Sequence, residues 1–263
     1  MKKKRVWQIL VFIIIILMAI LVLSLNQLYG YFIFSKPYFN ETYVSLRFDD
    51  GLKSQLRAFS LLKEYNLTGS MYIITDKPDT LIEWEKEYYL SWEEIRNLSN
   101  FMEIGSHSSS HPDLTKIKDY KSEIAGSKKT LEERGFNVTT FVYPAGNYNP
   151  QIIEEARKNY DCASTQDVGT NYPPIRPLLL KDFTMRSLND IDTAKRVIKK
   201  GKWNILTFHD IGKIDGNLPS SYNSVADYNS LDLETFKSIL DHLKKENIKV
   251  ITITEGCEIF KNG

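Results

Sequence analysis

Short strand-like runs alternate with amphipathic segments along most of this chain, and this order is the feature that most limits its fold. Tyr43–Phe48 and Thr139–Pro144 are apolar runs with β-branched or aromatic residues, and Ser54–Tyr65 carries apolar residues at helical spacing. Because strands joined through helices form parallel sheets with right-handed crossovers, the order predicts an α/β fold. We expect a distorted (β/α) barrel of about seven strands, with an open doubly wound sheet as the alternative.

The expected elements follow from periodicity, capping residues and turn residues. The predicted strands are 43–48, 68–75, 102–105, 139–144, 161–164, 183–187, 204–208 and 249–254. The predicted helices are 54–65, 91–100, 119–134, 151–159, 191–200 and 233–245. Residues 76–89 and 166–182 are expected to be loops without regular structure, and no internal repeat is visible.

The amino-terminal segment differs in composition from the rest. Lys2–Arg5 is basic, and the run Val6–Leu25 is almost entirely apolar and about the length that crosses a bilayer. A cleaved signal peptide is the alternative, but Ser24–Gly30 offers no good cleavage site of the Ala-x-Ala type. We therefore expect a cytoplasmic tip and single transmembrane helix (1–25), a juxtamembrane linker (26–41) and an extracellular domain attached to the cell membrane (42–263).

Charge and cysteine content narrow the choice of partners. The chain has 34 basic and 33 acidic residues, and four of the basic ones precede the anchor. A nearly neutral domain argues against a nucleic-acid partner and suits an uncharged substrate such as a glycan. Cys162 and Cys257 are far apart in sequence; they could pair or remain separate buried thiols, and we do not predict a disulfide.

Chemically active residues follow three of the predicted strands. Asp49 and Asp50 come directly after the first strand, His107 and His111 after the third, and His209 after the strand 204–208. The carboxyl ends of barrel strands share one mouth, so these side chains are expected to form one site. Taken alone, the two aspartates could simply cap the next helix, and the histidine pair is weak evidence for a metal.

Two motifs in this order resemble those of the polysaccharide deacetylases, the NodB-homology domain of carbohydrate esterase family 4. Arg47-Phe-Asp-Asp-Gly51 matches the family's Thr-Phe-Asp-Asp-Gly except at its first position, and His107-Ser-Ser-Ser-His111 matches His-Ser/Thr-x-x-His. Phe141-Val-Tyr-Pro-Ala-Gly146 lacks the arginine of the family's Arg-x-Pro-Tyr motif and is closest in form to poly-N-acetylglucosamine deacetylases. The fourth motif has no clear match, and the last appears loosely as Leu206-Thr-Phe-His209.

The resemblance implies roles for individual residues. Asp50, His107 and His111 would hold a divalent metal, with zinc as first choice and cobalt or nickel also suitable. Asp49 would be the catalytic base and His209 the acid. The resemblance further implies that Arg186 supplies the missing arginine, that the turn Tyr143-Pro144-Ala145 binds the oxyanion, and that Asp161, Asp167 or Asp182 partners His209.

The implied activity is that of a metal-dependent hydrolase acting on linear amide bonds. It would remove N-acetyl groups from N-acetylglucosamine residues of an extracellular or cell-wall polysaccharide. The alternatives are a catalytically inactive glycan-binding protein on the same fold and a related cyclic imide or amide hydrolase.

Overall fold

The computed structural model describes residues 7, 13–27, 41–186, 190–198, 202–212 and 230–261. The chain divides into two units, Met1–Asn40 and Glu41–Gly263. In the first unit, residues 13–27 form a helix with exposed apolar side chains. Within the described residues, no helix has both the length and the apolar character needed to cross a membrane. Much of the expected anchor and of the linker lies outside the described residues, so both stay predictions.

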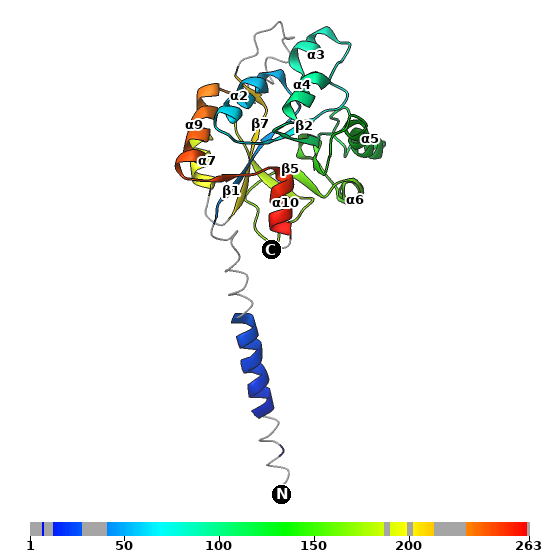
Figure 1. Ribbon diagram of the computed structural model, residues 1–263. Coiled ribbons are helices and arrows are strands. Elements are labelled where there is room, and N and C mark those ends of the chain that lie inside the picture. The colour runs from blue at the N-terminus through cyan, green and yellow to red at the C-terminus, as the bar shows by residue number, and fades with distance from the viewer. Residues whose placement is uncertain are drawn as a thin grey trace. The chain divides into compact units, whose positions relative to one another are not determined.

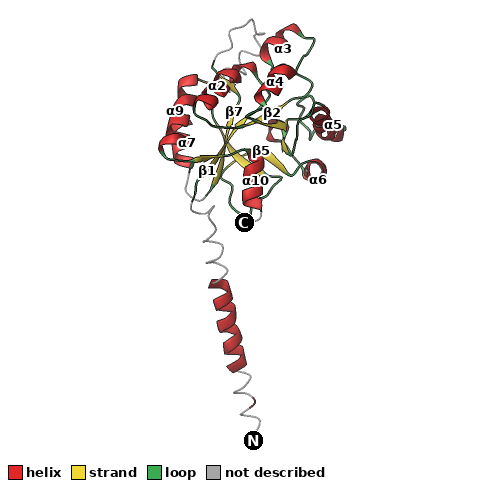
Figure 2. Cartoon of the chain, viewed as in Figure 1, coloured by secondary structure: helices red, strands yellow, loops and turns green. Residues whose placement is uncertain are grey.

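The second unit is a closed parallel barrel (Figures 1 and 2), which confirms the expected barrel of about seven strands. Strands β1 to β7 are neighbours in chain order, and β1 pairs with β7 to close the ring. The strands are β1 (Tyr43–Phe48), β2 (Ser70–Ile73), β3 (Glu103–Ser106), β4 (Thr140–Val142), β5 (Cys162–Val168), β6 (Leu180–Thr184) and β7 (Trp203–Phe208). A short strand, β10 (Lys249–Val250), also pairs with β1, and β8 (Asp210–Ile211) pairs with β9 (Ser230–Leu231) in a separate sheet.

Helices surround the strands, as Figure 2 shows. They are α2 (Leu56–Glu64), α3 (Glu83–Tyr88), α4 (Trp92–Leu98), α5 (Tyr120–Glu133), α6 (Pro150–Asn159), α7 (Asp190–Val197), α9 (Leu233–Lys245) and α10 (Ile253–Lys261), with one-turn helices at Lys53–Gln55 and Pro144–Gly146. Alternate residues of β1 face the surrounding helices and the barrel interior. Val44, Leu46 and Phe48 pack in the apolar core beneath the helices. Of the alternate residues, Ser45 accepts a hydrogen bond from Trp203 on the neighbouring β7, and Arg47 donates to the Thr165 carbonyl oxygen on β5.

Capping residues explain where two helices begin or end. Ser91 Oγ accepts the backbone N–H of Glu94, and the Glu94 carboxylate accepts the Ser91 N–H, so α4 starts with the predicted capping box. Helix α5 ends before Gly135, whose φ of 82° confirms the expected left-handed stop.

The carboxyl-terminal strand is shorter than predicted. It ends at Val250, and the chain turns into α10 where the sequence pattern favoured a strand to Thr254. The reason is a second capping box: the Thr252 N–H donates to Glu255 Oε2 (2.7 Å), and the Glu255 N–H donates to Thr252 Oγ1 (3.2 Å). This signal was present in the sequence and was not recognised.

Other boundaries also differ from expectation. The segment expected to be irregular between 76 and 89 contains α3. Strand β5 runs on to Val168, and β6 begins at Leu180 instead of residue 183, so the loop between them is shorter than expected.

A disulfide joins Cys162 and Cys257, which the sequence did not lead us to predict. The two residues are 95 positions apart in sequence. They meet because α10 returns to the start of β5, a contact that depends on closure of the barrel. The bridge fastens the last helix to the sheet.

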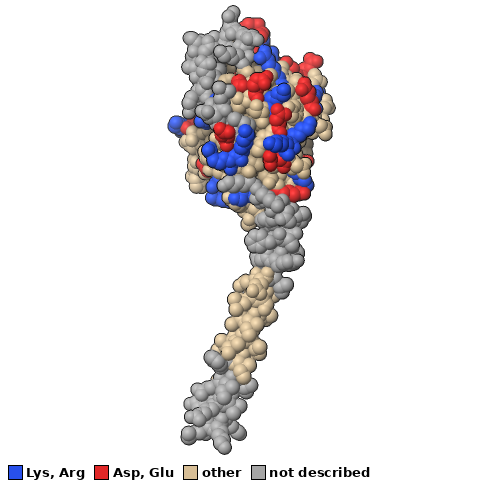
Figure 3. Space-filling view, turned by 90° about the vertical axis from the view of Figure 1, so that its left-hand side faces the viewer, with Lys and Arg blue, Asp and Glu red and all other residues tan. Residues whose placement is uncertain are grey.

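The surface of the barrel unit carries charges of both signs. On the face seen in Figure 3, Lys and Arg side chains alternate with Asp and Glu side chains over the part of the chain that is described.

Helix α10 approaches β7 closely enough to exclude a side chain at Gly256. A Cβ there would lie 2.2 Å from Trp203 Cζ2, so Gly256→Ala should lower the free energy of unfolding by about 1–3 kcal/mol through overpacking. Gly126→Ala, inside α5 with only Ser109 Oγ at 3.5 Å, is the matched control and should raise stability by up to about 1 kcal/mol. Urea unfolding measures both, and equal midpoints for the two variants would contradict the prediction.

Candidate active site

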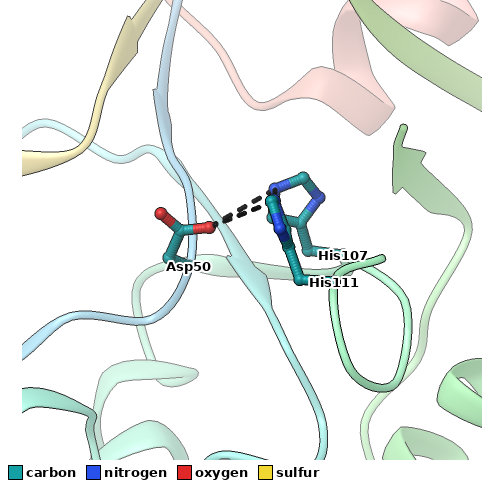
Figure 4. A group of neighbouring side chains, drawn as sticks. All are labelled: Asp50, His107 and His111. Atoms are coloured by element: carbon teal, nitrogen blue, oxygen red, sulfur yellow. Dashed lines mark hydrogen bonds and ion pairs between the residues drawn. The ribbon is translucent and has the colours of Figure 1, made fainter. Parts of the chain in front are cut away.

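Asp50, His107 and His111 come together at the carboxyl ends of β1 and β3, as predicted. Asp50 Oδ1 lies 3.4 Å from His107 Nε2 and 3.8 Å from His111 Nε2, and the two Nε2 atoms are 3.1 Å apart. Figure 4 shows both imidazole rings next to the Asp50 carboxylate. The three side chains thus present one oxygen and two nitrogen atoms to a common point.

This donor set fits a divalent metal. Ligand atoms about 2.0–2.2 Å from one ion lie about 3–3.5 Å from each other, close to the spacing found here. Asp50 Oδ1 is buried and has no hydrogen-bond partner among the described residues, as expected of an atom suited to bind a cation. Oxygen and imidazole ligands suit zinc, cobalt or nickel, and three ligands leave further coordination positions open.

The charge balance of the site also fits a divalent cation. Asp49 and Asp182 are completely or almost completely buried, and Asp50 is mostly buried, whereas Arg47 is the cation that pairs with two of them. The buried carboxylates therefore outnumber the guanidinium that pairs with them, and a divalent ion would reduce this excess of negative charge. Burial, with a smaller contribution from the charge of Asp49, raises the pKa of Asp50 to about 6.

Neighbouring groups orient the two histidines. His107 Nδ1 lies 2.9 Å from the Val142 carbonyl oxygen and donates to it, which leaves the Nε2 lone pair facing Asp50. Burial lowers the pKa of His107 to about 3, so the ring is neutral and able to bind a metal. Glu123 on α5 accepts the backbone N–H groups of Ser109 and Ser110 at 3.0 and 2.9 Å, and so shapes the loop that carries His111.

The backbone around the site is strained. Asp50, Ser108, His111 and Ala145 are not glycines, yet they have φ angles of 73°, 64°, 62° and 52°. Each left-handed residue of this kind costs roughly 1 kcal/mol or more, and such residues concentrate where function fixes the backbone. Here two of the four are candidate metal ligands.

Arg47 is the site residue that the sequence interpretation missed. It is fully buried on β1, and its Nη2 lies 3.0 Å from Asp49 Oδ2. Although burial acts in the opposite direction, the charge of Arg47 holds the pKa of Asp49 below its usual range, so the carboxylate stays ionised. A charged residue inside an apolar strand, two positions before the predicted base, was the signal that could have revealed it.

Arg186 was expected to orient Asp49, but the arginine that pairs with Asp49 is Arg47. Arg186 follows β6 and lies near enough to Asp182 for its charge to lower the pKa of that carboxyl, which burial raises overall. The expected role depended on the third motif, which lacks an arginine. The first motif supplies the guanidinium instead, at its one mismatched position.

His209 follows β7 and faces Asp49. Its Nε2 lies 3.9 Å from Asp49 Oδ2, and its side chain is 12% exposed. Gln55 Nε2 donates to the backbone oxygens of Asp49 (2.7 Å) and His209 (3.0 Å), so it links the ends of β1 and β7 that carry these two side chains.

The three carboxylates considered as partners of His209 lie in different places. Asp161 is exposed before β5, and Asp167 is exposed and accepts a hydrogen bond from Tyr148. Asp182 is buried and pairs with Arg47. The carboxylate that faces His209 is Asp49 itself.

The turn after β4 narrows the choice of oxyanion donor. Tyr143 is buried, and its backbone N–H donates to the Ser164 carbonyl oxygen at 3.1 Å, so it is already used. Pro144 has no N–H. Of the three residues predicted for this role, Ala145 is therefore the one left to donate from the backbone, and it is exposed with a left-handed φ of 52°.

Comparison with known proteins agrees with this geometry. Residues 36–160 match the family model for polysaccharide deacetylase. The match includes the two aspartates, the two histidines and the turn after β4, and ends before β5. No curated protein matches the chain.

The solved structures that resemble this chain include several deacetylases. A polysaccharide deacetylase from Bacillus cereus is 30% identical with a TM-score of 0.47, over 52% of this chain and 45% of its own, so the chain spans less than half of that protein. Peptidoglycan deacetylase PdaC from Bacillus subtilis is 18% identical with a TM-score of 0.52, over 84% of this chain and 92% of its own. A Streptococcus pyogenes deacetylase, PplD, in complex with acetate is 23% identical with a TM-score of 0.53, over 59% of this chain and 70% of its own. The last two likenesses show a shared fold.

The histidine pair gives a direct test of metal binding. We expect the full chain to bind one zinc or cobalt ion. Loss of a group that only hydrogen-bonds to a metal ligand typically weakens metal binding roughly 10–100-fold. His111→Ala removes one of three ligands, so it should weaken binding by more than this. Isothermal titration calorimetry measures the affinity. His242→Ala, on α9, is the matched control and should leave the affinity unchanged. Equal affinities for the two variants would remove His111 from the site.

Proposed function

We propose that this chain is a metal-dependent polysaccharide deacetylase, which removes N-acetyl groups from N-acetylglucosamine residues of a cell-wall or extracellular polysaccharide. The family match over residues 36–160 supports this assignment. The observation that carries it is that a candidate metal trio lies beside a carboxylate and a histidine. Amide hydrolysis needs a base and an acid, and the carboxylate and the histidine would supply them in that order.

Asp50, His107 and His111 would hold the ion. When bound, a divalent metal polarises the acetamide carbonyl and lowers the pKa of a water molecule. Asp49 takes a proton from the attacking water. Its Oδ2 is engaged by Arg47, and its Oδ1 has no hydrogen-bond partner among the described residues, so Oδ1 is the atom available as base.

The remaining steps use residues at the ends of β4 and β7. The backbone N–H of Ala145 stabilises the developing oxyanion. His209 donates a proton to the leaving nitrogen, because an amine anion would be a very poor leaving group. The carbon–nitrogen bond then breaks, and the products are acetate and a free amine on the sugar.

An inactive glycan-binding protein on this fold is the alternative from another class. Its support was the missing arginine of the third motif and the absence of the fourth motif. Arg47 removes the first of these, because it supplies a guanidinium to the base from β1. The described residues give no specific support to a cyclic imide or amide hydrolase.

The decisive experiment is acetate release from an N-acetylglucosamine oligomer by the full chain, with zinc or cobalt added. Asp49→Asn should lower kcat by about 10²–10⁴-fold, since it removes the base. Asp161→Asn changes an exposed aspartate outside the site and should leave kcat unchanged. A wild-type chain that binds the metal but releases no acetate from any N-acetylated glycan would favour the binding protein.

Membrane attachment and an extracellular domain are part of the proposal, supported by the apolar run Val6–Leu25 and its basic flank. We expect the full chain to stay in the membrane fraction after a high-salt wash, and a chain that starts at residue 36 to be released. External protease should digest the barrel unit of intact, wall-free cells. Recovery of the full chain in the soluble fraction would contradict the anchor.

A further inference from the structure

We infer that Arg47, Asp182 and Thr207 form a positioning relay inside the barrel that fixes the orientation of Asp49. This inference rests on the proposed function. Asp182 on β6 and Thr207 on β7 reach the base only through Arg47, so they are positioning residues that do not contact the substrate. The relay links three consecutive strands of the closed barrel, β6, β7 and β1.

The relay is defined by short contacts between buried groups. Thr207 Oγ1 donates to Asp182 Oδ2 at 2.6 Å, and Arg47 Nη2 forms an ion pair with the same oxygen at 2.6 Å. Arg47 Nη2 also lies 3.0 Å from Asp49 Oδ2, and Nη1 donates to the Thr165 carbonyl oxygen at 3.3 Å. Asp182 is thus the closer partner of the guanidinium, and it fixes the atom that Asp49 must meet.

Stability alone does not explain this arrangement. Burying an ion pair costs desolvation free energy, and apolar residues of similar volume often stabilise a fold equally well or better. The network is also incompletely satisfied, because Arg47 Nε and Asp182 Oδ1 are buried without hydrogen-bond partners among the described residues. A costly, partly satisfied network next to a reactive carboxylate is typical of a functional site.

The geometry shows what the relay achieves. Arg47 engages Asp49 through Oδ2, the oxygen that also faces His209 at 3.9 Å. Oδ1 of Asp49 is left without a partner among the described residues. Because Arg47 on β1 and Asp49 directly after that strand are two positions apart, both side chains point into the barrel, and a guanidinium held by Asp182 on β6 fixes the rotation of the carboxylate.

Kinetics with the full chain test this inference. Asp182→Asn should lower kcat about 10–100-fold, as expected for loss of an outer partner, with KM and metal stoichiometry unchanged. Arg47→Met should lower kcat by about 10²-fold or more. Glu103→Gln is the control: its carboxylate is bonded to Ser70 and Thr140 on neighbouring strands, so it should lower Tm without changing kcat.

A double-mutant cycle separates positioning from a general loss of structure. If Arg47 acts through Asp49, Arg47→Met should have no further effect on the residual kcat of Asp49→Asn. A further loss equal to that in the wild-type background would overturn the relay.

A crystal structure of Asp182→Asn gives a test that does not depend on activity. We expect the Asp49 carboxylate to rotate and its Oδ2 to lose contact with Arg47 Nη2. An unchanged Asp49 would overturn the relay even if the chain proves inactive. Absence of acetate release by the wild-type chain would count against the proposed function and not against the relay.

Discussion

The pairing of β1 with β7 is the interaction on which the rest of the structure depends. Six residue pairs, from Tyr43 with Trp203 to Phe48 with Phe208, close the barrel between its first and last wall strands. The Asp49 N–H then donates to the Phe208 carbonyl oxygen at 3.0 Å, which continues the ladder into the site. A shift of this register by one residue would turn Arg47 and Asp49 toward the helices and Phe48 toward the barrel interior. The strand pairing that closes the barrel therefore also places the residues on which the proposed chemistry depends.

The barrel interior is polar at both ends, for different reasons. At the carboxyl end, buried carboxylates and Arg47 lie beside the candidate metal trio, and several of their polar atoms have no hydrogen-bond partner in the described part of the chain. Toward the amino end, the Glu103 carboxylate is well satisfied: it accepts hydrogen bonds from Ser70, Thr140 and Thr254. Buried polar groups that lack hydrogen-bond partners among the described residues are thus concentrated at the carboxyl end, where a cation and a substrate would enter. The hydrogen-bonded ones described here lie toward the amino end, where their role is structural.

Features that depend on local sequence patterns were predicted, whereas features that depend on contacts formed only in the closed barrel were missed. Strands and helices follow from periodicity and caps, and the metal trio from one strand end and one short loop. Arg47 was missed because its partner Asp182 lies far along the chain, on β6, and Arg186 was preferred because the third motif lacks an arginine. The disulfide could not be predicted, since only the closed barrel brings α10 to β5. The capping box at Thr252 was visible and was overlooked.

Because Cys162 and Cys257 form a disulfide, the redox state of the compartment determines whether this covalent link is present in the fold. Cytosolic thiols are kept reduced, so a chain made and retained there would lack this link. Helix α10 would then be held by non-covalent contacts such as the stacking of Phe260 on Trp203, with ring centroids 5.6 Å apart, and the close fit of Gly256. Protein recovered from a reducing compartment and protein recovered from an oxidising one would share the candidate site but differ in how firmly α10 is attached to β5.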